Sequence, residues 1–166
     1  MSNKDAVALL KHDHETVKSL FEQVNKLNKR DSDKKERVFD EIKAALEVHA
    51  TIEEEIFYPA VKKARSEHVK DEIREAYEEH KKIKQLLAKI SDITASDERF
   101  DSKVKELKET VEHHVSEEEG EMFGDAKKYL GEPRLIELGA QLEARKGQLE
   151  KHPTSKSSSS GRQVSH

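Results

Sequence analysis

The chain has 166 residues, of which 40% are charged and only 5% aromatic, with three prolines and no tryptophan. This composition is typical of long solvated helices rather than sheets. The 31 basic and 35 acidic residues give a formal net charge of −4 and are mixed along the same segments, which leaves no basic face for phosphate backbones. The absence of cysteine excludes disulfides, thiolate metal sites and cysteine nucleophiles. We therefore expect a soluble, cytoplasmic, all-helical protein with neither a membrane span nor nucleic acid as a partner.

Capping signals and breaks predict the first half of the chain as two helices. The first is expected over about 3–28, opened by a capping-box pattern from Ser2 to Asp5. The second is expected to start near Asp33 and to reach the segment 57–59. Proline lacks a backbone donor and clashes with the preceding turn, so Pro59 should kink or end this helix.

Three more helices are expected, over about 67–92, 97–130 and 133–151, with Gly131 followed by Pro133 as the break before the last. The run TSKSSSSGRQVSH has nothing to bury and is expected to be disordered. The expected division of the chain is a four-helix bundle (1–131), an amphipathic helix packed on it (132–152) and a Ser-rich tail (153–166).

The second half of the bundle repeats the first. EIKAALEVHATIEE (41–54) lies over ELKETVEHHVSEEE (106–119) at an offset of 65, and HDHETVKSLF (12–21) lies over EEHKKIKQLL (78–87) at an offset of 66. Two helical hairpins with the same sequence pattern can pack together and bury the apolar stripes that neither hairpin buries alone. The sequence therefore predicts an all-α, antiparallel up-down four-helix bundle with a fifth helix after it.

Four histidines fall on the apolar stripes of the predicted helices, and two of them are followed one turn later by a glutamate. A single core histidine is more often a hydrogen-bonded core residue than a ligand. Four imidazoles and two carboxylates converging inside a bundle instead predict a metal site. The predicted ligands are His14, His49, Glu53, His80, His114 and Glu118. The remaining histidines are off-stripe, in loops or in the tail and are excluded: His12, His68, His113, His152 and His166.

The ligand set favours two iron ions, with manganese as the alternative. Six ligands exceed the four that a tetrahedral zinc ion uses. Calcium and magnesium prefer oxygen ligands and would not use the imidazole nitrogens. Two ions bridged by Glu53 and Glu118, with a solvent-derived oxo or hydroxo bridge, account for all six ligands.

These motifs resemble the hemerythrin, or HHE cation-binding, family. The resemblance rests on DHETVKSLF with His14, HATIEEEIFYP with His49, EEHKKIKQLL with His80 and HHVSEEEGEMF with His114, and it covers roughly residues 5 to 130. It implies a non-haem di-iron centre that meets O2, nitric oxide or peroxide.

Two departures from the family pattern bear on chemistry. Oxygen-carrying hemerythrins have a fifth histidine one turn from the one on the third helix, whereas His80 has Ala76 and Lys84 as its one-turn neighbours. One iron should therefore be more open, which favours peroxide or nitric oxide chemistry over O2 carriage. Tyr58 or Tyr77 could take the place of the missing fifth histidine as a metal ligand.

The second departure is spacing. Phe57 lies four residues after Glu53, but Phe123 lies five after Glu118, which suggests an insertion near Gly120 and makes Glu119 a rival to Glu118. The other acids of these segments are interpreted as a solvated face, with a weak ability to attract cations: Glu54, Glu55, Glu117 and Glu121.

Three hypotheses follow for function. The leading one is a di-iron protein that acts on O2, peroxide or nitric oxide in oxidative or nitrosative stress, with a catalase-like reaction among the expected activities. The second is an iron- or oxygen-sensing or storage module without turnover, in which the fifth helix reports occupancy to an unknown partner protein. The third is a metal-free structural bundle.

Overall fold

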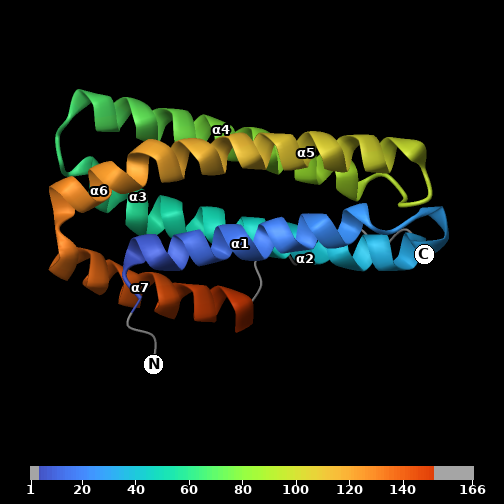
Figure 1. The fold of residues 1–166 in the computed structure, drawn as a ribbon, viewed down its shortest axis with the longest axis horizontal. Coiled ribbons are helices and arrows are strands. Elements are labelled where there is room, and N and C mark those ends of the chain that lie inside the picture. Colours follow the sequence, from blue (N-terminus) through green and yellow to red (C-terminus); the bar gives the residue numbers. More distant parts are fainter. Residues whose placement is uncertain (1–3, 152–166) are drawn as a thin grey trace.

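The computed structural model describes residues 4–151, and all regular elements in that range are helices. The long helices are α1 (Ala6–Asn25), α2 (Ser32–Ile52), α4 (Glu67–Ser91), α5 (Glu98–Glu117) and α7 (Glu132–Lys151). In Figure 1, α1 and α2 lie side by side as one hairpin and α4 and α5 as the other. The predicted four-helix bundle with a fifth helix is confirmed. The predicted disordered tail, 153–166, lies outside the described residues.

Polar caps set where the helices begin. The side chain of Asp5 accepts a hydrogen bond from the Ala8 amide, so α1 begins at Ala6 rather than at residue 3. The predicted role of Ser2 lies outside the described residues. The second helix is preceded by a short 3-10 turn, η1 (Lys29–Asp31), whose capping box joins Asn28 and Asp31. Asp33, near which the second helix was predicted to start, lies inside the first turn of α2.

The helical run that starts with α2 continues past Pro59, so of the two effects predicted for this proline, a kink or an end, the end is wrong. A π turn, η2 (Glu53–Phe57), follows α2 directly and is continued by α3 (Tyr58–Lys62), so Pro59 falls in the first turn of α3. The wider turn closes with the Tyr58 amide donating to the carbonyl of Glu53, five residues back. A first-turn position tolerates proline because the missing N–H has no required partner there.

The second half has the same π turn at the equivalent place. There η3 (Glu118–Met122) follows α5 and is continued by α6 (Phe123–Leu130). Both π turns have five residues and both begin at the predicted bridging glutamate. The offset of 65 therefore holds through the turn and pairs Tyr58 with Phe123. The insertion predicted near Gly120 is wrong: it came from aligning the two phenylalanines, which are not equivalent.

The hydrophobic core consists of two clusters, one towards each end of the bundle. One includes Leu10, Ile52, Phe57 and Phe123, and the other includes Phe21, Phe39, Leu87 and Phe100. The predicted ligand histidines and glutamates lie along the helices between these two groups. Each apolar cluster thus shields one side of a buried polar layer from water, and low local dielectric strengthens the charge interactions in that layer.

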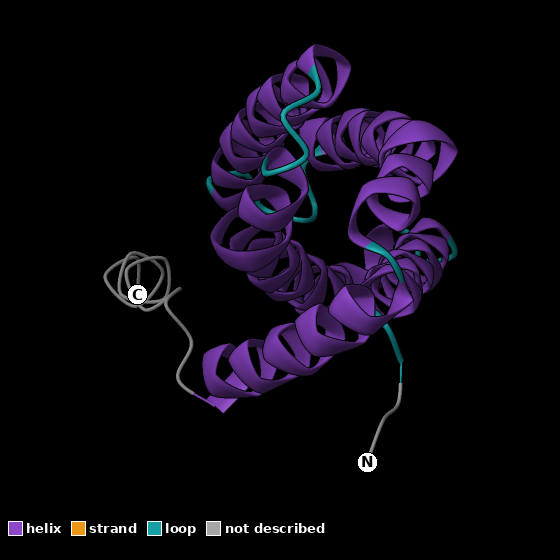
Figure 2. Ribbon diagram, turned by 90° about the vertical axis from the view of Figure 1, so that its left-hand side faces the viewer, coloured by secondary structure: helices purple, strands orange, loops and turns teal. Residues whose placement is uncertain are grey.

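The fifth helix covers the outside of the first hairpin. Figure 2 looks along the bundle and shows α7 lying across it. Its buried face packs on α1, α2 and α6 through the residues Leu135, Leu138, Leu142 and Leu149. Through residues 4–151, no helix has the length and apolar character needed to cross a bilayer.

Candidate metal centre

All six predicted ligands meet in the polar layer between the two apolar clusters. Each is buried, with between 0% and 7% of its surface exposed. Their donor atoms form two overlapping groups, in each of which every atom lies within 4.8 Å of the others. The first group, called here the N half, contains His14 and His49; the second, the C half, contains His80 and His114. Glu53 and Glu118 belong to both.

The two glutamates span the halves with separate oxygens. Glu53 places Oε2 3.2 Å from His49 Nε2 and Oε1 3.1 Å from His80 Nε2. Glu118 places Oε1 3.1 Å from His14 Nε2 and Oε2 3.4 Å from His114 Nε2. Each carboxylate therefore offers one oxygen to each half, which is the arrangement that a bridging ligand of a two-metal site requires.

Four acids surround the imidazoles in a role that was not predicted from the sequence. Each ligand histidine directs Nδ1 at a carboxylate on another helix. The distances are 2.9 Å from His49 to Asp13, 2.7 Å from His80 to Glu54, 2.6 Å from His114 to Glu79 and 2.7 Å from His14 to Glu119. We call Asp13, Glu54, Glu79 and Glu119 the outer carboxylates. A carboxylate only accepts, so Nδ1 donates, and each Nε2 is left to face the centre.

A signal for the outer carboxylates was present in the repeat. An acid directly precedes each lone histidine, and an acid directly follows each bridging glutamate, in both halves. Glu54 is therefore not merely part of a solvated face, as the sequence analysis had it. Glu119, the rival of Glu118, lies at the outer nitrogen of His14, whereas Glu118 is the acid that both halves share.

Tyr58 brings a hydroxyl into the centre. Its Oη lies 3.0 Å from Glu53 Oε1 and 3.3 Å from His80 Nε2, and it donates a short hydrogen bond to Glu118 Oε2. Tyr77, the other tyrosine considered from sequence, is 40% exposed, and its hydroxyl lies 3.4 Å from the backbone carbonyl of Glu54. The hydroxyl of Tyr58 therefore lies close enough to the centre to replace the missing fifth histidine, and the hydroxyl of Tyr77 does not.

Charge interactions raise the pKa of His49 and of His114 in the metal-free protein, and so favour their protonated forms. Burial lowers the pKa of His49, but the charge of Glu53 and the hydrogen bond to Asp13 outweigh burial and raise it to about 10. Burial likewise opposes the charge of His114, yet Glu118 and Glu53 raise its pKa well above the ordinary value. Burial works against Glu53 as well, and the charge of His49 still keeps its pKa well below the usual range.

The inner atoms fit a bound cation. Among the described residues, His14 Nε2, His49 Nε2, Glu53 Oε2 and Glu118 Oε1 are buried and lack a hydrogen-bond partner. These are the donor groups of the N half, and their close approaches to one another do not have hydrogen-bond geometry. Buried polar groups in a folded protein normally have partners, so four such atoms facing one point are accounted for by a positive ion. Nitrogen and oxygen donors in this ratio suit iron or manganese.

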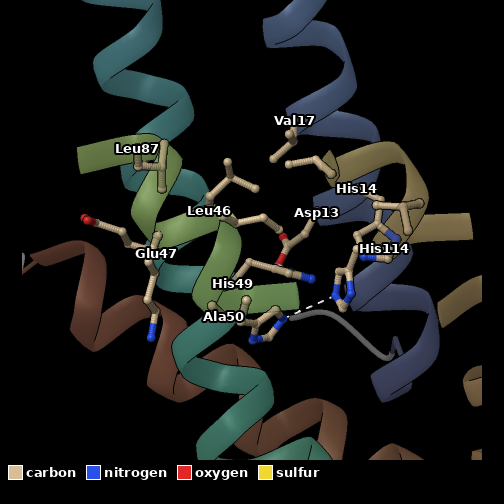
Figure 3. A pocket seen from close by; sticks show the side chains of 14 residues that line it. Asp13, His14, Val17, Leu46, Glu47, His49, Ala50, Leu87 and His114 are labelled. Carbon is tan, nitrogen blue, oxygen red and sulfur yellow. Dashed lines mark hydrogen bonds and ion pairs between the residues drawn. The ribbon is translucent and has the colours of Figure 1, made fainter. Parts of the chain in front are cut away.

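A small apolar chamber lies next to the imidazoles. Figure 3 shows the aliphatic side chains of Val17 and Leu46 lining the same pocket as His14, His49 and His114. The space measures about 30 Å³. That volume admits a molecule of about the size of water and no organic substrate.

A wider, acidic cleft reaches the centre from the other side. It measures about 200 Å³ and runs between α4 and the α5–η3 segment to His114 and Glu118. Hydrogen bonding to Glu79, together with burial, raises the pKa of Glu117 to about 8. Burial and the neighbouring Asp125 raise that of Glu72 to about 8. The excluded histidines among the described residues lie outside the centre: His68 and His113 are exposed beside this cleft, and His12 is exposed on α1.

Comparison with known proteins agrees with this geometry. The family described as hemerythrin HHE cation binding domain matches residues 5–126. A crystal structure of an HHE cation-binding domain-containing protein from Mycobacterium kansasii, an Rv2633c homologue, superposes with a TM-score of 0.77. The two chains share 26% identity, and the match covers 87% of this chain and 86% of that one.

A curated relative is a protein of Nostoc sp. named DNA nickase. It is 28% identical over 142 residues, which is 86% of this chain but only 39% of the Nostoc protein. The family match spans most of the chain, includes all six inner residues and agrees with the fold of the solved relative. The chain therefore belongs to the hemerythrin HHE cation-binding domain family, and its buried histidine–glutamate cluster fits a metal site.

Proposed function

We propose that the protein holds two iron ions and acts on O2, peroxide or nitric oxide, with peroxide removal in the cytoplasm during oxidative or nitrosative stress as the leading activity. The observation that carries the proposal is the pair of glutamates, each of which offers one oxygen to each half. His14 and His49 would hold one ion and His80 and His114 the other. Manganese is the alternative metal.

A bound iron pair supplies electrons and a site at which small oxidants bind. The chain supplies the surroundings. The two apolar clusters exclude bulk water, and the small chamber limits the ligand to a few atoms. The outer carboxylates keep each imidazole in one orientation. Small size rather than specific recognition then selects O2, peroxide or nitric oxide.

Tyr58 is the residue of the chain placed to move a proton at the centre. Burial and the charges of Glu53 and Glu118 raise the pKa of its phenol well above the ordinary value, so the hydroxyl keeps its proton in the metal-free protein. Cations in the centre would reverse that charge balance, because a bound metal favours the ionised form of a neighbouring acid. Tyr58 can then either donate its proton to a reacting oxygen or bind as the fifth ligand.

The proposal is tested by metal analysis and turnover together. Iron-loaded protein should contain two ions per chain, consume hydrogen peroxide and change its visible spectrum with O2 or nitric oxide. Glu53→Ala and Glu118→Ala should each lose the second ion and most of the activity. Protein that binds two ions but neither consumes peroxide nor changes its spectrum would reject the activity while leaving the site intact.

The second candidate is an iron- or oxygen-sensing or storage module without turnover. The contact that favours it is the one between Lys146 of α7 and Asp13, which joins the fifth helix to the centre. Under this reading, deletion of residues 133–166 should abolish the response of a partner protein and spare the metal content. Peroxide turnover at a useful rate by the intact protein would favour the first candidate.

The Nostoc relative is named for DNA nicking, and we do not propose that activity for this chain. The chain spans 39% of that protein. The cleft that reaches the centre is lined by carboxylates, among them Asp71, Glu75 and Glu121. Such a lining repels a phosphate backbone, whereas proteins that bind DNA without sequence preference present lysine and arginine.

A further inference from the structure

The fifth helix is docked closely on the start of α1. A Cβ atom added at Gly139 would lie 2.4 Å from the backbone oxygen of Lys4 and 3.0 Å from the amide nitrogen of Ala6. Leu135 and Leu142 are fully or almost fully buried in the same contact. The position of α7 relative to α1 is therefore set by backbone proximity and by apolar packing.

Two consecutive basic residues of α7 connect it to segments that carry the metal centre. Arg145 contacts Glu55 in η2 with two hydrogen bonds, Nε to Oε1 at 2.8 Å and Nη2 to Oε2 at 3.2 Å. The next residue, Lys146, donates from Nζ to Oδ1 of Asp13 at 2.6 Å. A bidentate pair and a charge-assisted bond are the stronger kinds of polar contact.

The Lys146 contact continues to an inner ligand. Asp13 is buried, and its other oxygen, Oδ2, accepts from His49 Nδ1 at 2.9 Å. His49 in turn directs Nε2 at Glu53 Oε2, 3.2 Å away. One line of contacts thus runs from α7 through Asp13 and His49 to a bridging glutamate.

This connection distinguishes the two halves of the centre. Among the described residues, Asp13 is the outer carboxylate that accepts a hydrogen bond from a lysine. Its equivalent Glu79 faces His113 at 3.5 Å, and Lys84 lies 3.9 Å from Glu54. The equivalent of Glu55 in the second half is Gly120, which carries no side chain for a basic residue to hold. Within the described residues, the fifth helix therefore contacts an outer carboxylate of the N half directly, through Lys146 and Asp13, and makes no such contact with an outer carboxylate of the C half.

We propose that Lys146 is a positioning residue for the N half: it holds Asp13, which fixes the orientation and tautomer of His49, so that docking of α7 controls the affinity of one of the two metal sites. The inference rests on the two-ion centre proposed above. Loss of the partner that orients a ligand histidine costs roughly 10- to 100-fold in metal affinity. Loss of Lys146, one contact further out, is expected to weaken the N half about 10-fold and to leave the C half unchanged.

Lys146→Met tests this in the full chain, with anaerobic Co²⁺ titration followed by visible absorption as the probe. Lys146→Arg keeps the charge and a hydrogen-bond donor and should restore affinity. Lys151→Met, at the exposed end of the same helix, is the matched control and should match the wild type. Thermal unfolding of the metal-free variants shows whether α7 stays docked, because detachment would lower the unfolding temperature of Lys146→Met well below that of the control.

Half-site variants assign the effect. His114→Ala disables the C half, so adding Lys146→Met should weaken the remaining ion about 10-fold. His49→Ala disables the N half, so the same addition should leave the remaining ion unchanged. Equal weakening in both backgrounds, or none in either, would overturn the inference. A wild-type protein that binds fewer than two Co²⁺ ions would instead reject the two-ion centre, and the two failures are thus distinguishable.

Discussion

Tyr58 and Phe123 occupy equivalent positions in the two halves of the chain, yet only the tyrosine brings a polar atom to the centre. Each directly follows a π turn, and each ring lies against one inner histidine. Tyr58 lies 5.6 Å from His80 between ring centroids, and Phe123 stacks on His14 at 5.8 Å. The repeat therefore builds a symmetric ligand set with an asymmetric lining, in which the phenol serves the C half and an apolar ring covers the N half.

Replacing the phenol should separate metal binding from reactivity. We expect Tyr58→Phe to keep both ions, because the six inner ligands remain, and to lower peroxide turnover roughly 100-fold if the phenol supplies a proton. If the phenol binds iron instead, the visible spectrum of the ferric protein should change. Tyr77→Phe is the matched control and should alter neither. A Tyr58→Phe protein with unchanged turnover and spectrum would assign the hydroxyl a structural role only.

Alanine substitutions at two neighbouring histidines of α5 should have very different effects on metal content and activity. His114 is buried in the C half, whereas His113 is exposed and faces Glu79 and Glu117. His114→Ala should reduce the metal content from two ions to about one per chain and abolish most activity. His113→Ala should keep both ions and the activity. Elemental analysis and peroxide assays of the purified proteins measure the two effects. Equal damage from the two changes would mean that the inner face of α5 is wrongly assigned.

The stability of the metal-free protein should fall as the pH rises from 6 to 9. The pKa of His49 is raised from 6.5 to about 10, so its stabilisation is complete below 6.5 and is lost as the pH rises towards 10. Glu72 has a pKa raised from 4.5 to about 8, so its ionisation destabilises the fold over that interval. In both cases the folded chain binds more protons than the unfolded chain, and stability therefore decreases with pH.

Thermal unfolding with a chelator present, at several pH values, measures this slope. Glu72→Gln should flatten it. On the acid side the sign reverses, because the pKa of Glu53 is lowered and its contribution is lost as the pH falls below 4.5. Metal ions displace the imidazole protons, so the stabilisation gained on metal addition should grow with pH. An unfolding temperature that rises from pH 6 to pH 9 without metal would contradict the proton balance of the buried layer.

Two glycines of α7 should respond in opposite directions to alanine. At Gly139 the added methyl group meets the backbone of residues 4–6, at the start of α1, which cannot move as a side-chain end can. Gly139→Ala should therefore destabilise the protein by about 1–3 kcal/mol. Gly147 has nothing within 4 Å of an added Cβ, so Gly147→Ala should stabilise it by about 0.5–1 kcal/mol through helix propensity. Denaturant titration of both variants measures the difference, and equal effects would show that α7 is not held at Gly139.

Metal-loaded protein should leave supercoiled plasmid DNA intact, because carboxylates line the cleft that reaches the centre. Agarose gels after incubation with the iron- and manganese-loaded forms measure the relaxed fraction. The metal-free protein and the His49→Ala variant serve as controls for contaminating nuclease. Relaxation by the loaded wild type that is lost in His49→Ala would give this chain the activity named for its Nostoc relative.

The repeat and the helical period were sufficient to predict the bundle and to bring six particular side chains together. His49 and Glu53 lie one turn apart on one helix face, and the offset of 65 places His114 and Glu118 likewise. Such relations depend only on the geometry of a helix, which is local. The helix start at Ala6 and the passage of the helix through Pro59 were mispredicted, since capping alternatives and a π turn differ by small local energies that the surrounding packing decides.

What the sequence determined by itself is which six side chains lie together in the buried polar layer, because residues on one helical stripe must face one core. What only the tertiary structure decided is the set of contacts between helices that no single period encodes. The outer carboxylates bind histidines of other helices, and Glu119 faces the outer nitrogen of His14, whereas Glu118 belongs to both halves. The contact of Lys146 with Asp13 joins residues 133 positions apart. The physical reason is that partners so distant in sequence meet only once the hairpins and α7 have docked, and a charge that this docking buries must have a partner of opposite charge or a hydrogen bond within reach.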